Sequence, residues 1–280
     1  MRKITLPSPY QEISDEVVHP SIIELSPEIS QYRYAVAYTP YPNSNYLYEN
    51  PCVAYTNDFI SFEGDVSNPI VKQPGHGYNS DPELCIVDKR LYLMNRFRSS
   101  LGNDYNLYEF NKDEGWVFKS LLIKGEHKVQ DFGSPSLFTD NKHYYFFSHN
   151  LDEEGWGLEL RISDQLEAIQ SAPVIQIKYD LQNGRIWHSS FRKYKDDIIG
   201  LVQFADFTGG VGKLAIVKVD LISSRLITLD TTEKNCFYKC GLVFDEKEDS
   251  VQLILSTKTG QWELFYDEKK VSPDFLGIIE

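Results

Sequence analysis

Hydrophobic and polar residues alternate over short stretches of this chain, and clusters of charged residues separate the stretches. Alternation of this kind is typical of half-buried β-strands. In the segment 80–98, "SDPELCIV" and "RLYLMNRFR" are two strand-like runs, and the pair Asp88-Lys89 lies at their junction. Clusters of Asp, Asn and Lys between such runs mark the tight turn of a β-hairpin. The segment therefore predicts a strand, a turn and a second strand.

The same unit recurs along the whole chain. Each copy begins with a polar residue, which is often followed by proline, and continues as a strand, a charged turn and a second strand that is usually rich in tyrosine. Further strand signals follow each copy, so that a full unit comprises about four strands. The copies begin roughly 50 to 60 residues apart, a spacing within the range of repeat architectures. They lie at 19–40, 80–98, 134–150, 187–206 and 238–257.

Four strands in about 50 residues, repeated five times, predict an all-β fold, a five-bladed β-propeller with four-stranded blades around a central channel. A β-sandwich is the alternative, but it would not predict so regular a repeat. The segment 163–172 is predicted as a helical turn between two blades. We treat 1–280 as one domain, with blades at approximately 19–64, 80–123, 133–180, 186–230 and 236–280.

The N-terminal segment 1–18 precedes the first predicted blade. A propeller whose first and last blades do not join leaves an exposed sheet edge, which proteins avoid. We therefore predict that this segment pairs with the fifth blade and closes the ring.

Composition narrows the class of protein. Hydrophobic residues make up 41% and charged residues 25% of the chain, as in soluble globular proteins. The net charge of −13 argues against the nucleic-acid backbone and against an anionic membrane as partners. The N-terminus lacks the apolar core of a secretory signal, and no apolar run is long enough to span a membrane. We expect a cytoplasmic or virion-associated protein and leave protein partners open.

The cysteines carry no sign of a redox or metal site. No two of them have the CxxC spacing, and most lie in strand-like apolar stretches. We therefore expect reduced and mostly buried thiols. These residues are Cys52, Cys85, Cys236 and Cys240.

The first residues of the five units are the main candidates for chemistry. In a propeller the innermost strand of each blade lines the channel, so its first residue faces one mouth. Proline follows the first three of these residues; it restricts the preceding residue to extended backbone and cannot donate a ladder hydrogen bond. Several of these side chains are ionisable and would be costly to bury without a function or a partner. The five residues are His19, Asp81, Ser134, His188 and, less clearly, Lys239.

A second group of candidates lies in the segment 37–51, "AYTPYPNSNYLYENP". Glu49 is an acid here, and tyrosines surround it. Aromatic rings beside a polar mouth are the usual platform for sugar rings, whose C–H faces stack on them. Arg96, at the end of the second strand of blade two, is expected to orient hydroxyls or an acidic sugar group. With Arg96, the predicted substrate-binding residues are Tyr38, Tyr41, Asn50, Tyr78, Ser134 and Trp187.

Six short motifs carry a resemblance to a known class of enzymes. They are "HPSI" (19–22), "AYTPYP" (37–42), "ENPCVAYTNDFISFEG" (49–64), "NSDPEL" (79–84), "SPSLF" (134–138) and "IWHSSF" (186–191). Their order resembles the five-bladed propellers of glycoside hydrolase families 43 and 32 and carbohydrate-processing relatives in phage tails. The resemblance implies an oligosaccharide or polysaccharide as substrate. It also implies three catalytic carboxylates in blades one, three and four; here His19, Ser134 and His188 occupy those regions.

The leading hypothesis is a glycoside hydrolase with a non-standard site. Glycoside hydrolysis needs two carboxyl groups, one protonated and one ionised. We assign Glu49 as the acid and Asp81 as the base, with His19 and His188 as partners. No cofactor is expected, although these residues are also a credible ligand set for a metal ion in the channel. Two further alternatives are a propeller that binds glycans without cutting them and a platform for protein partners.

Overall fold

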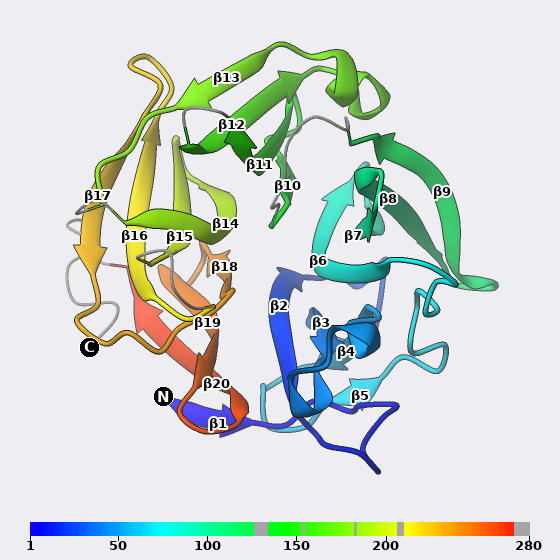
Figure 1. Cartoon of the computed structure of the whole chain (residues 1–280). Coiled ribbons are helices and arrows are strands. Elements are labelled where there is room, and N and C mark those ends of the chain that lie inside the picture. The colour runs from blue at the N-terminus through cyan, green and yellow to red at the C-terminus, as the bar shows by residue number, and fades with distance from the viewer. Residues whose placement is uncertain (126–133, 153–154, 182–183, 206–209, 272–280) are drawn as a thin grey trace.

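The computed structural model describes residues 1–125, 134–152, 155–181, 184–205 and 210–271. Five antiparallel sheets of four strands each stand as blades around a common centre (Figure 1). The predicted fold class is confirmed. In each of the first four blades the strands follow one another in chain order from the innermost strand outwards.

The first two blades contain eight strands. Blade one consists of β2 (Val17–Glu24), β3 (Tyr34–Pro40), β4 (Cys52–Thr56) and β5 (Glu63–Gly64). Blade two consists of β6 (Tyr78–Val87), β7 (Arg90–Ser99), β8 (Gly102–Asn111) and β9 (Gly115–Ile123).

The next two blades have the same construction. Blade three consists of β10 (Ser136–Thr139), β11 (Tyr144–Asp152), β12 (Gly155–Ser163) and β13 (Val174–Ile177). Blade four consists of β14 (Arg185–Tyr194), β15 (Asp197–Ala205), β16 (Lys213–Asp220) and β17 (Arg225–Thr231).

Blade five joins the two ends of the chain. Its three inner strands are β18 (Gly241–Asp245), β19 (Ser250–Lys258) and β20 (Trp262–Lys270), and its outer strand is β1 (Arg2–Ile4) (Figure 1). Arg2 lies opposite Tyr266 and Ile4 lies opposite Leu264. The pairing covers the outer edge of β20 with the N-terminal strand, which is the closure predicted for the segment 1–18.

Apolar side chains fill the spaces between neighbouring blades. Between blades three and four, for example, the rings of Phe147 and Phe191 stack with centroids 4.0 Å apart, and both side chains are fully buried. Large aromatic side chains of this kind supply much of the burial that stabilises a sheet-on-sheet contact. The prediction of free thiols is confirmed, since all four cysteines are unpaired and three of them are buried.

Regular helix is confined to short 3-10 segments in the described part of the chain. They are η1 (Pro42–Ser44), η2 (Tyr46–Tyr48) and η3 (Leu166–Ser171). The helical turn predicted at 163–172 is present as η3, but its placement between two blades was wrong. It connects β12 and β13 within blade three, and its buried Leu166 and Ile169 pack into the core shared with blade two. Among the described residues, no helix is long and apolar enough to span a membrane.

Candidate functional site

Three inner strands carry an irregularity close to where they begin. The pairing register shifts between Val18 and Ser21 in β2, between Ser80 and Glu83 in β6, and between Ile186 and His188 in β14. A β-bulge of this type bends the strand and re-aims a side chain. The residues delivered by the three bulges include His19, Asp81 and His188.

The backbone at two of these bulges differs from the expectation. His19 has φ 56° and Asp81 has φ 47°, so neither has the extended conformation predicted for a residue before proline. The reason is the bulge. At each bulge the chain turns at the residue before the proline, and the proline itself cannot donate a ladder hydrogen bond. A left-handed conformation at a non-glycine residue costs about 1–3 kcal/mol and persists only where the surrounding structure holds it.

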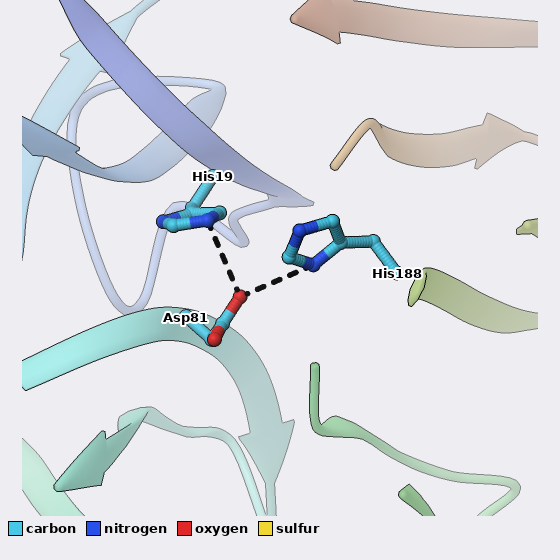
Figure 2. Close-up of side chains that lie close together, drawn as sticks. All are labelled: His19, Asp81 and His188. Atoms are coloured by element: carbon cyan, nitrogen blue, oxygen red, sulfur yellow. Dashed lines mark ion pairs between the residues drawn. The ribbon is translucent and has the colours of Figure 1, made fainter. Parts of the chain in front are cut away.

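The three re-aimed side chains meet at one point (Figure 2). Asp81 Oδ1 lies 3.6 Å from His19 Nε2 and 3.4 Å from His188 Nδ1. One potential ligand atom from each residue lies within 4.8 Å of the other two. All three residues are buried. The convergence predicted from the strand starts is thus present in the structure.

Asp81 is held as an anion by its neighbours. Its Oδ2 forms an ion pair with Arg96 Nη2 at 3.0 Å and accepts a hydrogen bond from Ser80 Oγ at 3.2 Å. Burial raises the pKa of Asp81, but the charge of Arg96 and the two histidines outweigh this and hold the pKa well below its usual value. Since Arg96 engages Oδ2, Oδ1 is the oxygen directed at the histidines.

The two histidines are neutral and poorly satisfied. His19 Nδ1 contacts Thr39 Oγ1 at 3.0 Å, a contact that either tautomer of the ring can make; the tautomer with its proton on Nδ1 would leave the lone pair of Nε2 for a cation beside Asp81. His19 Nε2 and both ring nitrogens of His188 have no hydrogen-bond partner among the described residues. Burial lowers the pKa of both rings, that of His19 strongly, although Asp81 opposes the shift. Buried neutral imidazoles with unpaired nitrogens are the form that binds a cation.

Glu49 lies beside this cluster and is a proton-carrying group. Burial raises the pKa of its carboxyl to about 8; Asp81 adds to the shift, whereas a hydrogen bond with Ser80 and the charge of Arg96 oppose it. Glu49 is therefore mostly protonated at neutral pH. The pKa of Glu49, the predicted acid, is thus raised, and the pKa of Asp81, the predicted base, is lowered. Opposite shifts of this kind are typical of a pair that divides acid and base roles.

A cavity of about 270 Å³ opens onto these groups. Aromatic side chains form much of its wall. The ring of Tyr238 meets His188 edge-on with centroids 4.2 Å apart and lies 5.0 Å from the ring of His19. The lining residues are His19, Tyr41, Tyr46, Glu49, Tyr78, Ser80, Asp81, Arg96, Trp187, His188 and Tyr238.

Three predicted substrate-binding residues do not line this cavity. Tyr38 is fully buried in the core between blades five and one, where its hydroxyl donates to the Pro7 carbonyl. Asn50 is buried and donates from its amide to Tyr10 and to the Leu47 carbonyl. Ser134 is buried behind Asp81, with Oγ 3.4 Å from Asp81 Oδ1. All three lie behind the lining of the cavity, so the structure does not bring them to its surface as predicted.

Tyr238 is the lining residue that the sequence analysis missed. It directly precedes Lys239, the residue aligned with the other strand starts, and β18 begins only at Gly241. A shift of one residue in the fifth unit would have selected the tyrosine. Tyr46 and Ser80 also line the cavity although neither was predicted to bind substrate.

A larger cavity of about 1110 Å³ lies at the opposite ends of the inner strands. Hairpin residues such as Leu25, Asp88 and Lys247 line it, and it contains none of the predicted site residues. Its charged groups of both signs are not gathered on a buried centre. We therefore place the candidate site at the smaller cavity.

The two distances from Asp81 to the histidines suit a shared cation. Two ligand atoms at about 2.0–2.1 Å from one ion in tetrahedral geometry lie about 3.3–3.4 Å apart. The separations of 3.4 Å and 3.6 Å from Asp81 Oδ1 are close to this value and too long for good hydrogen bonds. Two imidazoles and one carboxylate form a ligand set of the kind that Zn²⁺ and similar divalent metals prefer.

Comparisons with known proteins give structural neighbours only. No protein-family model matches the sequence, and no curated protein matches it. An N-acetylgalactosamine deacetylase from F. plautii, solved with blood group B trisaccharide, superimposes with a TM-score of 0.80 at 15% identity, over 99% of this chain and 96% of that enzyme.

Two glycoside hydrolases have the same fold. A family 43 endo-arabinanase from Bacillus licheniformis matches with a TM-score of 0.64 at 12% identity, over 95% of this chain and 96% of its own. A family 32 β-fructofuranosidase from Bombyx mori matches with a TM-score of 0.66 at 12% identity, over 98% of this chain and 63% of its own. The fold is therefore that of the five-bladed propellers of families 43 and 32, as the motifs indicated.

Proposed function

We propose that the protein is a carbohydrate-active hydrolase that removes an acyl group from an amino sugar with the help of a divalent cation. His19, Asp81 and His188 are the ligands of that cation. One observation carries the proposal: three ligand atoms from three blades converge, buried, at the base of a cavity, and the histidine nitrogens lack other partners among the described residues. Leaving such groups unpaired is costly unless a ligand completes the site.

The shape and lining of the cavity support a sugar as the ligand. Its volume of about 270 Å³ is below the range of roughly 300–1,000 Å³ for drug-sized ligands, which favours one sugar ring. Tyr41, Tyr46, Tyr78 and Trp187 offer faces for stacking, while Arg96 and Glu49 offer polar contacts. The neighbour solved with a trisaccharide is a deacetylase of an amino sugar, and this supports the class of substrate and reaction.

The reaction is the hydrolysis of an amide: water adds to the acyl carbon, the C–N bond breaks, and a carboxylate and a protonated amine form. The cation would polarise the acyl carbonyl and lower the pKa of water. Glu49 in its ionised form accepts a proton from water and returns it to the departing nitrogen. A cation close to Glu49 would lower the pKa of its carboxyl, which opposes the effect of burial and makes the ionised form accessible.

Tyr238 is placed to donate to the substrate. It is neutral, since burial raises the pKa of its hydroxyl well above the usual value. The side chain of Trp187 hydrogen-bonds to this hydroxyl, and because indole N–H can only donate, the hydroxyl proton of Tyr238 is left for another acceptor. The carbonyl oxygen of the acyl group is the acceptor that the reaction brings to this wall of the cavity.

Glycoside hydrolysis is the second candidate. The observation in its favour is the pair of carboxyl groups, Glu49 with a pKa of about 8 and Asp81 with a pKa well below its usual value. These suit an acid and a base. Against this assignment, Asp81 is engaged by Arg96 and faces two histidines, so little of the carboxylate is available to attack a sugar or to activate water.

A product assay separates these functions. The protein, stripped of metal with EDTA and then supplied with Zn²⁺ or Mn²⁺, is incubated with a broad panel of glycans that includes N-acetylated terminal sugars. Glycan binding, free amine with acetate, and new reducing ends are all measured on the same panel. We expect metal-dependent release of acetate, which Glu49→Gln reduces at least about 100-fold. Glu12→Gln, on an exposed carboxylate, is the matched control and retains the wild-type rate.

Each other outcome points elsewhere. Reducing ends without acetate would favour the glycoside hydrolase. Binding of a glycan without either product would leave a glycan-binding module. No binding and no product on a broad panel would contradict a role in carbohydrate chemistry and favour a platform for protein partners.

A further inference from the structure

A second cluster of charges lies further along the channel, behind the site. Glu83 is two residues beyond Asp81 on β6, and its carboxylate pairs with Arg192 from β14. Lys239, at the entry to blade five, approaches the other carboxylate oxygen, with Nζ 3.7 Å from Oε2. All three side chains are buried, and Lys239 is fully inaccessible to solvent. We call Glu83, Arg192 and Lys239 the channel cluster.

Lys239 also contacts the backbone of the bulge that presents Asp81. Its Nζ donates a hydrogen bond to the Pro82 carbonyl at 2.9 Å. Pro82 is the residue between Asp81 and Glu83, within the register shift of β6. One ammonium group from blade five therefore holds both the carbonyl and the carboxylate that follow Asp81 in the chain.

Asp81 needs such a tether because its backbone is strained. Its φ of 47° is in the left-handed region, and Pro82 offers no N–H with which the sheet ladder might hold the chain. Strained residues persist when their surroundings over-determine them. The hydrogen bond from Lys239 holds the Pro82–Glu83 peptide, one residue beyond Asp81, from across the channel.

We propose that Lys239 is a positioning residue that fixes the β6 bulge and thereby holds Asp81 Oδ1 between His19 and His188. The inference rests on the cation site of the proposed function. Lys239 touches neither the cation nor the substrate, and it acts through the Pro82 carbonyl and Glu83. Arg192 has a different role, because it donates to the Phe191 and Ile22 carbonyls and so ties blade four to blade one.

The charges predict that Lys239 can be removed without unfolding the protein. After Lys239→Met, Glu83 remains paired with Arg192 and Asp81 remains paired with Arg96, so neither carboxylate is left unpaired. Removing one partner of a buried ion pair is costly mainly when it leaves a charge uncompensated, and here it leaves none, so the expected loss of stability is that of the hydrogen bond to the Pro82 carbonyl. Loss of a residue that only stabilised the fold would lower the unfolding temperature without a specific loss of affinity for Zn²⁺.

The test is isothermal titration of Zn²⁺ alone into the metal-free full chain, together with thermal unfolding of each variant. We expect Lys239→Met to weaken Zn²⁺ binding about 10- to 100-fold, as the loss of a group that supports a ligand does, while the variant stays folded and unfolds cooperatively at an only slightly lower temperature. Lys270→Met is the matched control, because Lys270 is an exposed lysine of the same blade; it should leave both quantities unchanged.

The outcomes distinguish this inference from the proposed function. If the wild type binds no Zn²⁺, the cation site is contradicted. If the wild type binds and Lys239→Met binds within twofold of it, the cation site stands and the positioning role is overturned. Should Lys239→Met fail to fold, Lys239→Gln is measured in the same way, and wild-type affinity there overturns the inference equally.

Discussion

Two groups of buried ionisable side chains share strand β6 of the propeller, and they differ in the direct bonds that their members make. We call His19, Asp81 and His188 the mouth cluster. In the channel cluster, Glu83 is paired with Arg192 and Lys239 makes a hydrogen bond of 2.9 Å to the Pro82 carbonyl, although Glu83 Oε2 and Arg192 Nε lack hydrogen-bond partners among the described residues. In the mouth cluster, the closest approaches of the histidines to Asp81 are 3.4 Å and 3.6 Å, and histidine nitrogens lack partners among the described residues.

The difference separates a structural cluster from a functional one. Buried charges that pair with one another link elements of the fold, whereas buried groups that converge without pairing are costly unless a ligand joins them. Asp81 and Glu83 are only two residues apart in β6, so the two roles are divided by position along one strand. The bulge at Ser80–Glu83 is what sends Asp81 to the mouth.

The largest effect is expected from breaking the channel cluster. Glu83→Gln leaves Arg192 and Lys239 buried near each other without an anion between them. We expect a loss of about 3–5 kcal/mol in the free energy of unfolding, the usual cost of removing one partner from a buried ion pair. Urea unfolding followed by tryptophan fluorescence measures it.

The matched control for Glu83→Gln is Glu263→Gln, which removes the partner of Lys3 at the surface. Surface pairs contribute about 0–1 kcal/mol, so the control should change little. Equal costs for the two variants would mean that the channel cluster does not stabilise the fold in the way described.

A smaller effect is expected from the pH dependence of stability in the metal-free protein. The pKa of Glu49 is about 8 in the folded state, above the ordinary value of 4.5. Between these values the folded protein binds more protons than the unfolded chain, so the free energy of unfolding falls as pH rises, by up to about 1.4 kcal/mol per pH unit. The fall is complete once the pH exceeds the folded pKa.

The window from pH 6.5 to 8 is read as a difference between two proteins. Burial lowers the pKa of His19, His149 and His188 in the folded state, so their contribution to stability rises as the pH passes the unfolded pKa of about 6.5, in the wild type and in Glu49→Gln alike. The wild type should therefore lose stability relative to Glu49→Gln across the window. Parallel curves for the two proteins would contradict the raised pKa of Glu49.

The smallest effect concerns the support of the mouth cluster. Thr39→Val removes the hydroxyl that contacts His19 Nδ1 at 3.0 Å while keeping the shape of the side chain. Loss of such a partner releases the orientation of the ring, and we expect Zn²⁺ affinity to fall about tenfold. Thr257→Val is the control, because Thr257 Oγ1 is buried and has no hydrogen-bond partner among the described residues. Isothermal titration that ranks the two variants equally would contradict the role of Thr39.

The sequence predicted the fold and the core of the site for a physical reason. Hairpins with charged turns are local features, so their repetition along the chain can be read directly. Because equivalent strand starts converge in a propeller, His19, Asp81 and His188 were found from spacing alone. These three residues lie far apart in the chain, and only the repeat of the strand unit relates them.

The finer assignments depend on which face of a strand or turn a residue occupies, and spacing along the sequence does not give that face. Tyr38 and Tyr41 are three residues apart, yet Tyr38 lies in the core and Tyr41 lines the cavity. Asn50 and Ser134 are polar residues near the site whose buried contacts support it rather than face the cavity. Left-handed backbone at His19 and Asp81 followed from bulges, which depend on strand pairing across the blade and have no local signature.

The most direct test of the account is diffraction from crystals grown with Zn²⁺, measured at the zinc absorption edge. The account predicts one anomalous peak in the mouth cluster, about 2.0–2.2 Å from His19 Nε2, Asp81 Oδ1 and His188 Nδ1, and none in the channel cluster. The contradicting result is a crystal in which zinc binds elsewhere but no anomalous peak lies between these three atoms. The mouth cluster would then not be a cation site.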